Sequence, residues 1–177
     1  MPSSPRLKKV RQVHSNIKSM LIIFFDIRGI VHKEFVPPRQ TVNGNFYFEV
    51  LRRLRETVMW KWPAMRKNRD CLLHHDNAPA HTLLIVSEFL TKNSMTTVPH
   101  PAYSPDLAPC DCYVFPKIKL WLKGRHFVSI EEIQPESQKA LNMLTQANFN
   151  DCFQKWQNRW DRCMQAQGDY FKGDGGN

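Results

Sequence analysis

The amino-acid sequence predicts an α/β fold, because strand-like and helix-like segments alternate along its 177 residues. Residues 20–25 are wholly apolar, which is typical of a buried strand, and residues 30–36 alternate apolar and polar side chains as a returning strand would. Between them, the stretch from Asp26 to Gly29 has turn chemistry, and Gly29 can take a positive φ. We therefore expect an antiparallel hairpin at the start of the fold.

An amphipathic helix is expected next, over residues 44–59. Pro37 and Pro38 end the preceding strand, and Asn43 suits the N-cap of the helix. Apolar residues then recur at the spacing of one helix face. They are Tyr47, Val50, Leu51, Leu54 and Val58.

A strand–helix–strand unit follows this helix. Residues 70–75 read as a second buried strand, and Pro79 can begin a helix over residues 79–92 with Asn93 as its C-cap. Residues 95–98 form a short third strand. A helical crossover of this length makes the second and third strands parallel.

The last third of the chain is expected to be helical. A proline-rich loop over residues 99–109 leads into a helical segment that contains Asp111. Residues 129–132 have a capping-box pattern that begins another helix, in which Pro135 costs about 3 kcal/mol and would kink or restart it. A final helix over about 149–166 has one apolar seam, which favours packing in the core or in a dimer. The seam consists of Phe149, Cys152, Phe153, Trp156, Trp160 and Cys163.

The composition favours a polyanionic partner. The 25 Lys and Arg residues exceed the 16 Asp and Glu residues, which gives a net charge of +9 and a pI near 9.5. Nucleic acid is therefore a more natural partner than a membrane surface. The longest apolar run is far shorter than the roughly 20 residues of a membrane-spanning helix.

The two ends of the chain are expected to lie outside the core. Residues 1–18 carry five basic residues and no carboxylate, so we expect a basic, flexible arm with no secretory signal, free in solvent or in contact with phosphate. Residues 19–171 are expected to form one domain, and residues 172–177 a disordered tail. The five cysteines lack disulfide-framework spacing, which favours a reducing compartment.

Two carboxylates stand out by their position. Asp76 follows the second predicted strand, and Asp111 lies at a loop–helix junction 35 positions later. Because α/β sheets bind ligands at the carboxyl ends of their strands, these side chains can meet there. Paired carboxylates suit Mg²⁺ or Mn²⁺, and two such ions can serve phosphodiester chemistry. By spacing alone, a cap or a surface charge remains the commoner role for an Asp pair.

Histidines accumulate near the same two segments, at His74, His75, His81 and His100. A zinc site is one reading of such a cluster. However, no Cys-x-x-Cys pair exists, and Cys110 and Cys112 are too close for the usual finger spacing. Packing around the site or contact with phosphate is favoured for these histidines.

Two motifs resemble those of a known family. Residues 74–81 read His-His-Asp-Asn-Ala-Pro-Ala-His, and residues 103–111 read Tyr-Ser-Pro-Asp-Leu-Ala-Pro-Cys-Asp. They resemble the HDN-x-P-x-H and YSPDLAP-x-D motifs of mariner-type transposases. The separation of Asp76 and Asp111 is also similar to that of the family's second and third catalytic aspartates. The resemblance implies an RNase H-like sheet with flanking helices, two divalent ions (Mg²⁺ or Mn²⁺), and cleavage and transfer of DNA strands.

The resemblance also assigns roles to individual residues. Asp76 and Asp111 become the catalytic metal ligands, whereas Asp106 has a structural role in its loop. The other motif positions are Asn77, His81, Tyr103, Ser104 and Pro105. Two basic clusters are the candidates for nucleic-acid contact, with a solvated face as the alternative for each. They are Arg6, Lys8, Lys9 and Arg11, and Lys117, Lys119, Lys123 and Arg125.

The family pattern includes segments that this sequence does not match. Mariner transposases have a first catalytic aspartate on an opening strand and helix-turn-helix segments before it, whereas residues 1–18 resemble the linker after that strand. We therefore expect a truncated RNase H-like domain that lacks the first strand, with Asp26 as a turn residue. In the family, that first strand lies between the hairpin and the strand that contains Leu72. Without it, we expect a fold of marginal stability, in which the Met20 and Leu72 strands pair directly with each other or one of them pairs with a strand from another chain.

Three functions are compatible with these expectations. The favoured one is a transposase-derived protein that associates weakly or non-specifically with DNA in the nucleus, or in the cytoplasm, and is inactive in transposition. The second is a residual Mg²⁺- or Mn²⁺-dependent DNA endonuclease, similar to the transposase part of methyltransferase–mariner fusion proteins. The third is a non-catalytic remnant for protein interaction or dimerisation. A homodimer is left open in each case.

Overall fold

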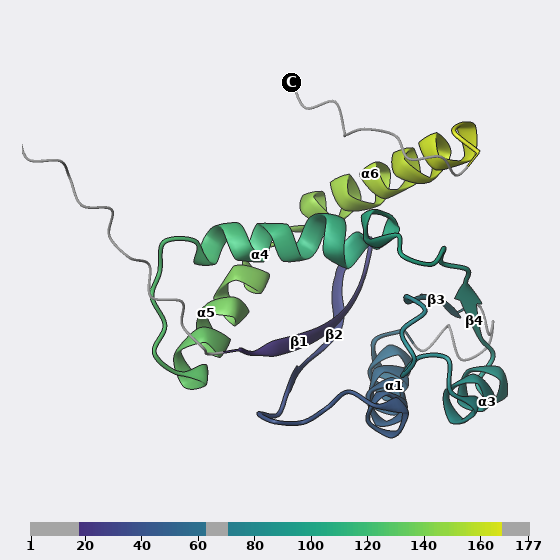
Figure 1. Ribbon diagram of the computed structural model, residues 1–177, viewed down its shortest axis with the longest axis horizontal. Coiled ribbons are helices and arrows are strands. Elements are labelled where there is room, and N and C mark those ends of the chain that lie inside the picture. The colour runs from purple at the N-terminus through teal and green to yellow at the C-terminus, as the bar shows by residue number, and fades with distance from the viewer. Residues whose placement is uncertain (1–17, 63–70, 168–177) are drawn as a thin grey trace, which may run out of the picture.

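The computed structural model of the protein describes residues 18–62 and 71–167 (Figure 1). Apart from Lys18, the expected basic arm and the expected C-terminal tail lie outside these ranges. The strands are β1 (Met20–Asp26), β2 (Gly29–Val36), β3 (Cys71–His74) and β4 (Met95–Val98). The helices are α1 (Gly44–Lys61), α3 (Leu84–Lys92), α4 (Phe115–Leu122), α5 (Ile130–Asn142) and α6 (Gln146–Gln165). No helix in the described ranges is long and apolar enough to cross a membrane.

The predicted hairpin is confirmed. β1 and β2 pair antiparallel, from Met20 opposite Val36 to Asp26 opposite Gly29. In the turn, the Asp26 carboxylate accepts hydrogen bonds from the backbone N–H groups of Arg28 (2.8 Å) and Gly29 (3.1 Å). Gly29 has a φ of +138°, which a residue with a Cβ rarely adopts. Asp26 therefore stabilises the turn, as its position in the sequence predicted.

A β-bulge interrupts the hairpin near this turn. The register shifts by one residue, so that Val31 has no partner in β1. The Nζ of Lys61, the last residue of α1, donates hydrogen bonds of 3.0 Å to the carbonyl oxygens of Ile30 and Val31. The end of α1 thus satisfies backbone groups in the irregular part of β2.

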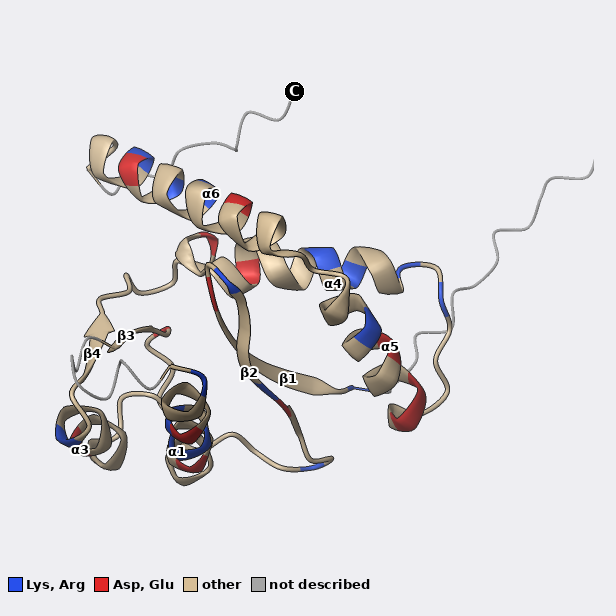
Figure 2. Cartoon of the chain, turned by 180° about the vertical axis from the view of Figure 1, so that it is seen from behind, with Lys and Arg blue, Asp and Glu red and all other residues tan. Residues whose placement is uncertain are grey.

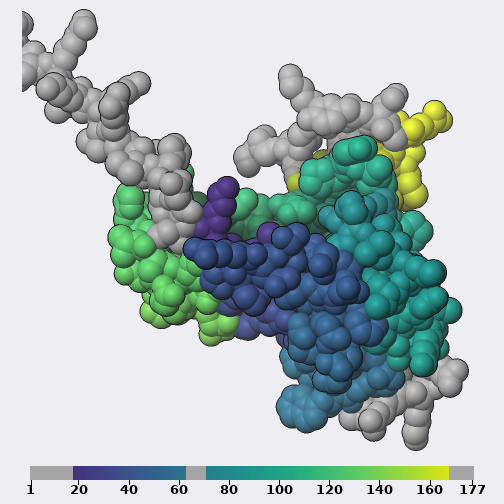
Figure 3. Space-filling model, turned by 60° about the horizontal axis from the view of Figure 1, so that its bottom comes forward, coloured from purple at the N-terminus to yellow at the C-terminus, as the bar shows by residue number. Residues whose placement is uncertain are grey.

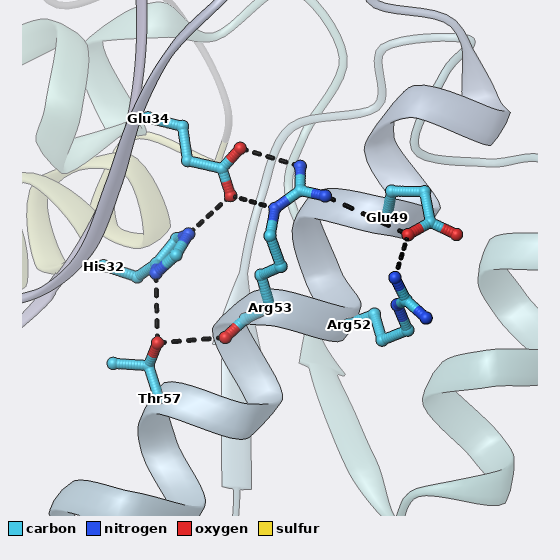
Figure 4. Close-up of polar contacts among 6 residues, drawn as sticks. All are labelled: His32, Glu34, Glu49, Arg52, Arg53 and Thr57. Atoms are coloured by element: carbon cyan, nitrogen blue, oxygen red, sulfur yellow. Dashed lines mark hydrogen bonds and ion pairs between the residues drawn. The ribbon is translucent and has the colours of Figure 1, made fainter.

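A polar network attaches β2 to α1 along the rest of the strand (Figure 4). The guanidinium of Arg53 binds the Glu34 carboxylate through two hydrogen bonds, of 2.9 and 2.7 Å. The His32 ring lies between Glu34 (2.6 Å) and the Thr57 hydroxyl (3.1 Å). Burial opposes ionisation of Glu34, but the hydrogen bonds from Arg53 and His32 outweigh it and lower the pKa of this carboxyl.

Two hydrophobic clusters form the core, and β1 contacts both of them. Ile23 is buried against the helical side made by α4, α5 and α6, whereas Phe24 packs on the side made by α1, α3, β3 and β4 (Figure 1). The buried members of the first cluster are Ile23, Tyr113, Val114, Ile118, Ala140, Leu141, Phe149 and Cys152. Those of the second are Val31, Tyr47, Leu51, Leu54, Leu73, Val86, Leu90 and Met95. In Figure 3, the chain between β2 and α1 (blue) lies between α5 (green) and the β3–β4 side (teal).

The predicted α1 is confirmed, and it extends two residues further than expected. The Asn43 side chain accepts a hydrogen bond from the Phe46 N–H, as an N-cap should. The predicted stripe is buried at Tyr47, Val50, Leu51 and Leu54. The extension matters because it places Lys61 where it reaches the bulge.

The strand–helix–strand unit is confirmed, with a correction to its helix. β3 and β4 are parallel, with Cys71 opposite Met95 and His74 opposite Val98. However, α3 begins at Leu84 and not at Pro79. Residues 79–81 form a turn and residues 82 and 83 a bend instead, and the chain folds back so that His81 contacts Asp76.

The two pairs of strands do not join into one sheet. Within the described residues, β1 pairs with β2 and β3 pairs with β4, and no ladder connects the pairs. The expected direct pairing of the Met20 and Leu72 strands is therefore not formed there. One half of the molecule contains β3 and β4, and the other contains the hairpin, α4, α5 and α6. Contacts between side chains, such as that of Trp156 with His74, hold the two halves together instead.

The start of α5 is a second correction. Ser129 occupies the N-cap position, but its side chain makes no capping hydrogen bond. The Glu132 carboxylate instead accepts a hydrogen bond from the Val128 N–H (2.9 Å), so the predicted capping box does not form. The helix also continues through Pro135 without a restart.

A capping box does form at the next helix. The Thr145 N–H donates to the Asn148 side chain (3.0 Å), and the Thr145 side chain faces the Asn148 backbone. This box starts α6 at Gln146, three residues before the expected position. The apolar seam of α6 packs into the core at Phe149 and Cys152.

We predict that Glu34→Gln lowers the free energy of unfolding by about 1–2 kcal/mol at neutral pH, because Arg53 loses a charged partner. Glu34 has a lowered pKa in the folded state, so its contribution is present above the ordinary value of 4.5 and is lost as the pH falls. Urea unfolding of both proteins near neutral pH and near pH ~3 should show the difference shrinking in acid. Glu49→Gln, at a more exposed carboxylate of the same network, is the matched control and should have a smaller effect. A difference that stays constant with pH would contradict this assignment.

Candidate functional site

Asp76 lies directly after β3, in a turn that fixes its side chain. Its Oδ1 accepts a hydrogen bond from the Ala78 N–H (3.1 Å) and lies 2.7 Å from Nδ1 of His81. A backbone hydrogen bond from His81 N to Ala78 O closes the turn. The carboxylate remains about half exposed, which leaves it open to a ligand from solvent.

Asp111 comes from the other half of the molecule. It is the second residue of a π-helical turn, Cys110–Val114, which precedes α4. The N–H groups of Asp111 and Cys112 both donate hydrogen bonds of 2.9 Å to the Ala108 carbonyl oxygen. The turn is anchored because Val114 is fully buried in the first hydrophobic cluster.

The structure brings Asp76 and Asp111 close enough to interact electrostatically. Burial raises the pKa of Asp111, and the negative charge of Asp76 raises it further. The charges of Lys119 and His100 act in the opposite direction. The two predicted ligands therefore lie within range of each other's charge, and a cation between them would relieve their repulsion.

The histidines of the first motif, together with His100 from the loop after β4, pack near Asp76. His74 Nε2 lies 3.2 Å from His100 Nδ1, and the Tyr47 hydroxyl lies 2.9 Å from His75 Nδ1. The rings of His75 and His81 stack with 5.1 Å between their centroids. Burial and neighbouring histidines lower the pKa values of His74 and His75 to about 4. Both side chains are therefore neutral at physiological pH, and they pack as predicted.

A hydrogen bond also joins the first motif to the loop that precedes the second motif. The Asn77 amide donates a hydrogen bond to the His100 carbonyl oxygen (2.6 Å). In the second motif, the Ser104 hydroxyl donates to the Ala102 carbonyl (3.1 Å), and Tyr103 is fully exposed with a positive φ of 57°. Asn77 thus links the turn after β3 to the loop after β4.

Asp106 lies in a 3₁₀ turn that begins at Pro105. Its backbone carbonyl accepts a hydrogen bond from the Arg159 guanidinium of α6 (3.3 Å). Asp106 is not among the groups that shift the pKa of Asp111. The structural role implied for Asp106 stays a prediction, since only its backbone is seen to take part.

Sequence reasoning missed two residues that support the site. Trp156 was expected only as part of the α6 seam, yet its Nε1 donates to the Leu107 carbonyl (2.7 Å) and its ring lies 5.1 Å from that of His74. Tyr47 was expected only as a core residue, but its hydroxyl reaches His75. The apolar periodicity of each helix located both side chains, although it carries no signal for their polar atoms.

Contact of Lys117, Lys119, Lys123 and Arg125 with nucleic acid stays a prediction, and the structure places these cations in different surroundings. Of these four cations, only Lys119 is among the charges that shift the pKa of Asp111. Lys117 lies over the Tyr113 ring at 4.8 Å, and Arg125 forms an ion pair with Glu136 of α5. Arg6, Lys8, Lys9 and Arg11 lie outside the described residues.

The donor chemistry at this edge fits a hard divalent cation. Asp76 and Asp111 supply carboxylate oxygens, which Mg²⁺ and Mn²⁺ prefer. Within the described ranges, however, no group of three or more His, Cys, Asp or Glu side chains is arranged to hold a metal ion. Cys110 is no substitute ligand or nucleophile, because burial above all raises the pKa of its thiol to about 12.

Comparisons with known proteins are consistent with this geometry. Residues 2–68 match the family described as Transposase (partial DDE domain). The chain is 28% identical over 172 residues to the mariner Mos1 transposase of Drosophila mauritiana, which covers 97% of this chain and 50% of Mos1. It is 26% identical over 158 residues to the histone-lysine N-methyltransferase SETMAR of Homo sapiens, which covers 87% of this chain and 22% of SETMAR.

Solved structures give the clearest match. The crystal structure of the Mos1 catalytic domain is similar with a TM-score of 0.82 and 30% identity, over 90% of this chain and 78% of that one. The chain belongs to the mariner transposase family. A pre-cleavage Mos1 transpososome matches with a TM-score of 0.87 and 29% identity, over 97% of this chain and 50% of the Mos1 chain.

Membership of the mariner family confirms the RNase H-like α/β class predicted from the motifs. The chain spans half the length of Mos1 and less than a quarter of SETMAR. What the whole relatives do therefore bears on this chain only as a proposal.

We predict that Asp76→Asn lowers the pKa of Asp111, because it removes the negative charge that disfavours ionisation of the second carboxylate. A carboxyl ¹³C NMR titration of Asp111 measures this directly. Asp106→Asn is the matched control and should leave the titration unchanged. If Asp111 titrates identically in wild type and Asp76→Asn, the two carboxylates do not share a site.

Proposed function

We propose that this chain is a DNA-associated protein derived from a mariner transposase, whose Asp76–Asp111 edge faces the DNA backbone. The observation that carries the proposal is the convergence of the two motif carboxylates, since the charge of Asp76 raises the pKa of Asp111. Lys119 adds a positive charge beside them. The solved Mos1 relatives include a pre-cleavage transpososome and paired-end complexes, which support DNA as the partner class.

The proposed cofactor is Mg²⁺ or Mn²⁺, bound weakly between Asp76 and Asp111. Structures of the Mos1 catalytic domain are known with Mg and with Mn. When bound, such an ion would activate an attacking oxygen or stabilise a leaving one. Two carboxylates are few ligands for a hard cation, so we expect an affinity weaker than that of a complete carboxylate site.

We further propose that these 177 residues alone do not carry out transposition. Phosphodiester cleavage with two metal ions needs more protein ligands than the two carboxylates that the described residues bring together. The chain would then act through DNA association, and a nuclear location follows from that role.

A second candidate function is a residual metal-dependent DNA endonuclease. The same carboxylate pair favours it, because a single bound cation next to Lys119 already provides some stabilisation of negative charge. A third candidate, a dimerisation or interaction remnant without DNA contact, has no specific observation in its favour and becomes an outcome of the tests below.

We predict that the chain binds labelled duplex DNA with an affinity that falls linearly as the logarithm of the salt concentration rises, since each neutralised phosphate contributes about −0.9 to the slope. Lys119→Gln should weaken binding and reduce the slope by about 1. Lys92→Gln, at an exposed position on α3, is the matched control. Fluorescence anisotropy across a salt series measures both effects. Absence of salt-dependent retention would overturn DNA association and favour the interaction remnant.

We predict no cleavage of labelled DNA by the chain in Mn²⁺ above the level of an Asp76→Ala/Asp111→Ala variant. Gel analysis of a nicking assay, with each single alanine variant in parallel, provides the measurement. Asp161→Asn on α6 controls for the loss of a carboxylate elsewhere. Cleavage by wild type that both alanine substitutions abolish would favour the endonuclease over our preferred function.

A further inference from the structure

A cavity of about 470 Å³ lies beside the β1–β2 turn and shares no lining residue with the Asp76–Asp111 edge. Residues 28–33 of the hairpin form one wall, and Lys61 closes it at the end of α1. The opposite wall comes from the end of α5 and the start of α6, between Leu141 and Phe149. None of the residues that line this cavity is acidic, whereas three are cations: Arg28, Lys33 and Lys61.

The backbone and neighbouring rings hold these cations in place. The Lys61 ammonium is fixed by two hydrogen bonds to the carbonyl oxygens of the β2 bulge. The Arg28 guanidinium lies 5.9 Å from the centre of the Trp62 ring, at cation–π distance. Burial lowers the pKa of Lys33, and the charge of Lys61 lowers it further. The ammonium groups of Lys33 and Lys61 therefore repel each other at the wall of the cavity.

The carboxylates nearest in sequence do not fully compensate this charge. Glu34 follows Lys33, but both of its oxygens are bound by Arg53 and His32 on the side of α1 (Figure 4). Asp26 precedes Arg28, but it accepts hydrogen bonds from backbone N–H groups of the turn. Asp26 offsets part of this charge, but three cations against one neighbouring carboxylate leave the cavity with an excess of positive charge, which an anion from outside would stabilise.

The opposite wall adds features that suit a phosphate ester. α6 begins at Gln146 in this wall, and its first turn contains no acidic residue that would neutralise the positive end of the helix dipole. Asn142 and Gln146 bring side-chain amides that can donate hydrogen bonds. Leu141, Leu144 and Phe149 add apolar surface, against which a sugar or base can pack. The volume lies within the range of about 300–1,000 Å³ that is usual for ligand pockets.

We propose that this cavity binds a backbone phosphate of a nucleic-acid strand, with Arg28, Lys33 and Lys61 as the cationic ligands. The inference rests on the proposed DNA association, and it adds a contact point separate from the Asp76–Asp111 edge. Basic positions in Figure 2 (blue) are spread over the hairpin, α1 and α4, and the cavity is where three of them converge on one space.

The test uses the double variant Arg28→Gln/Lys33→Gln. Lys61 is left intact, because it also closes the β2 bulge. The matched control is Arg39→Gln/Lys92→Gln, which removes the same charge at exposed positions outside the cavity wall. Far-ultraviolet circular dichroism and a thermal transition like that of wild type establish that each variant is folded.

Anisotropy with a labelled oligothymidylate gives the first readout. We expect the double variant to bind about tenfold more weakly at low salt, as the loss of one charge-assisted contact implies, whereas the control changes little. Its salt slope should be smaller in magnitude by about 0.7, the contribution of one phosphate of single-stranded DNA. Wild-type affinity and slope in the double variant, with DNA still bound, would overturn the cavity while leaving DNA association intact.

Backbone amide NMR shifts identify the ligand and its location. The oligothymidylate should shift the signals of Gly29 and Lys33 in wild type, and these shifts should be lost in the double variant. Inorganic phosphate and pyrophosphate are titrated in parallel. A response of these amides to the free anions but not to the oligonucleotide would overturn the strand phosphate as the ligand. If the wild type binds no DNA at all, both the cavity assignment and the proposed function are wrong.

Discussion

The position of Asp76 relative to Asp111 depends on packing between two halves of the molecule that share no strand ladder within the described residues. Asp76 belongs to the β3–β4 half, and Asp111 lies on a π-helical turn that packs with α4 and α6. Without hydrogen-bonded strands to fix the separation, side chains must do so. Trp156 is central, because it bonds the loop before Asp111 through its Nε1 and contacts His74 at the end of β3 through its ring.

The charge distribution follows from the same arrangement. The partly buried histidines next to Asp76, His74 and His75, stay neutral at physiological pH because their pKa values are lowered to about 4. They therefore contribute packing and hydrogen bonds but little positive charge. Asp76 and Asp111 repel each other, with only partial relief from Lys119 and His100. A cation suits that edge, whereas an anion suits the cavity beside the hairpin turn. Although the chain as a whole carries a net charge of +9, it therefore has one site that favours a cation and another that favours an anion.

Local signals predicted much of the fold, and long-range contacts explain the failures. The apolar runs of β1 and β3 and the Asn43 cap each act within a few residues, and each was found where the sequence placed it. The start of α3 was misplaced because the His81–Asp76 contact overrides the helix-start preference of Pro79. The sequence around the basic cluster before α5 gave no sign that Glu136, eleven positions from Arg125, would fold back and form an ion pair with it. The catalytic roles of Asp76 and Asp111 were predicted from the two family motifs. Their arrangement in space was not predicted, because neither the π-helical turn nor the contact of Trp156 with His74 has a local sequence signature.

β1 would link strand pairing to the proposed metal binding. Its side chains are apolar on both faces and pack on both clusters, as expected of a strand with neighbours on each edge, yet within the described residues it pairs with β2 alone. A strand that paired with its other edge would lie between the halves that carry Asp76 and Asp111. It would restrict their relative motion, and so reduce the entropy lost when a cation draws the two carboxylates together. By linkage, a bound cation would favour that pairing to the same extent. The stability of the interface between the halves and the proposed affinity for metal would then be coupled, and each could be measured through the other.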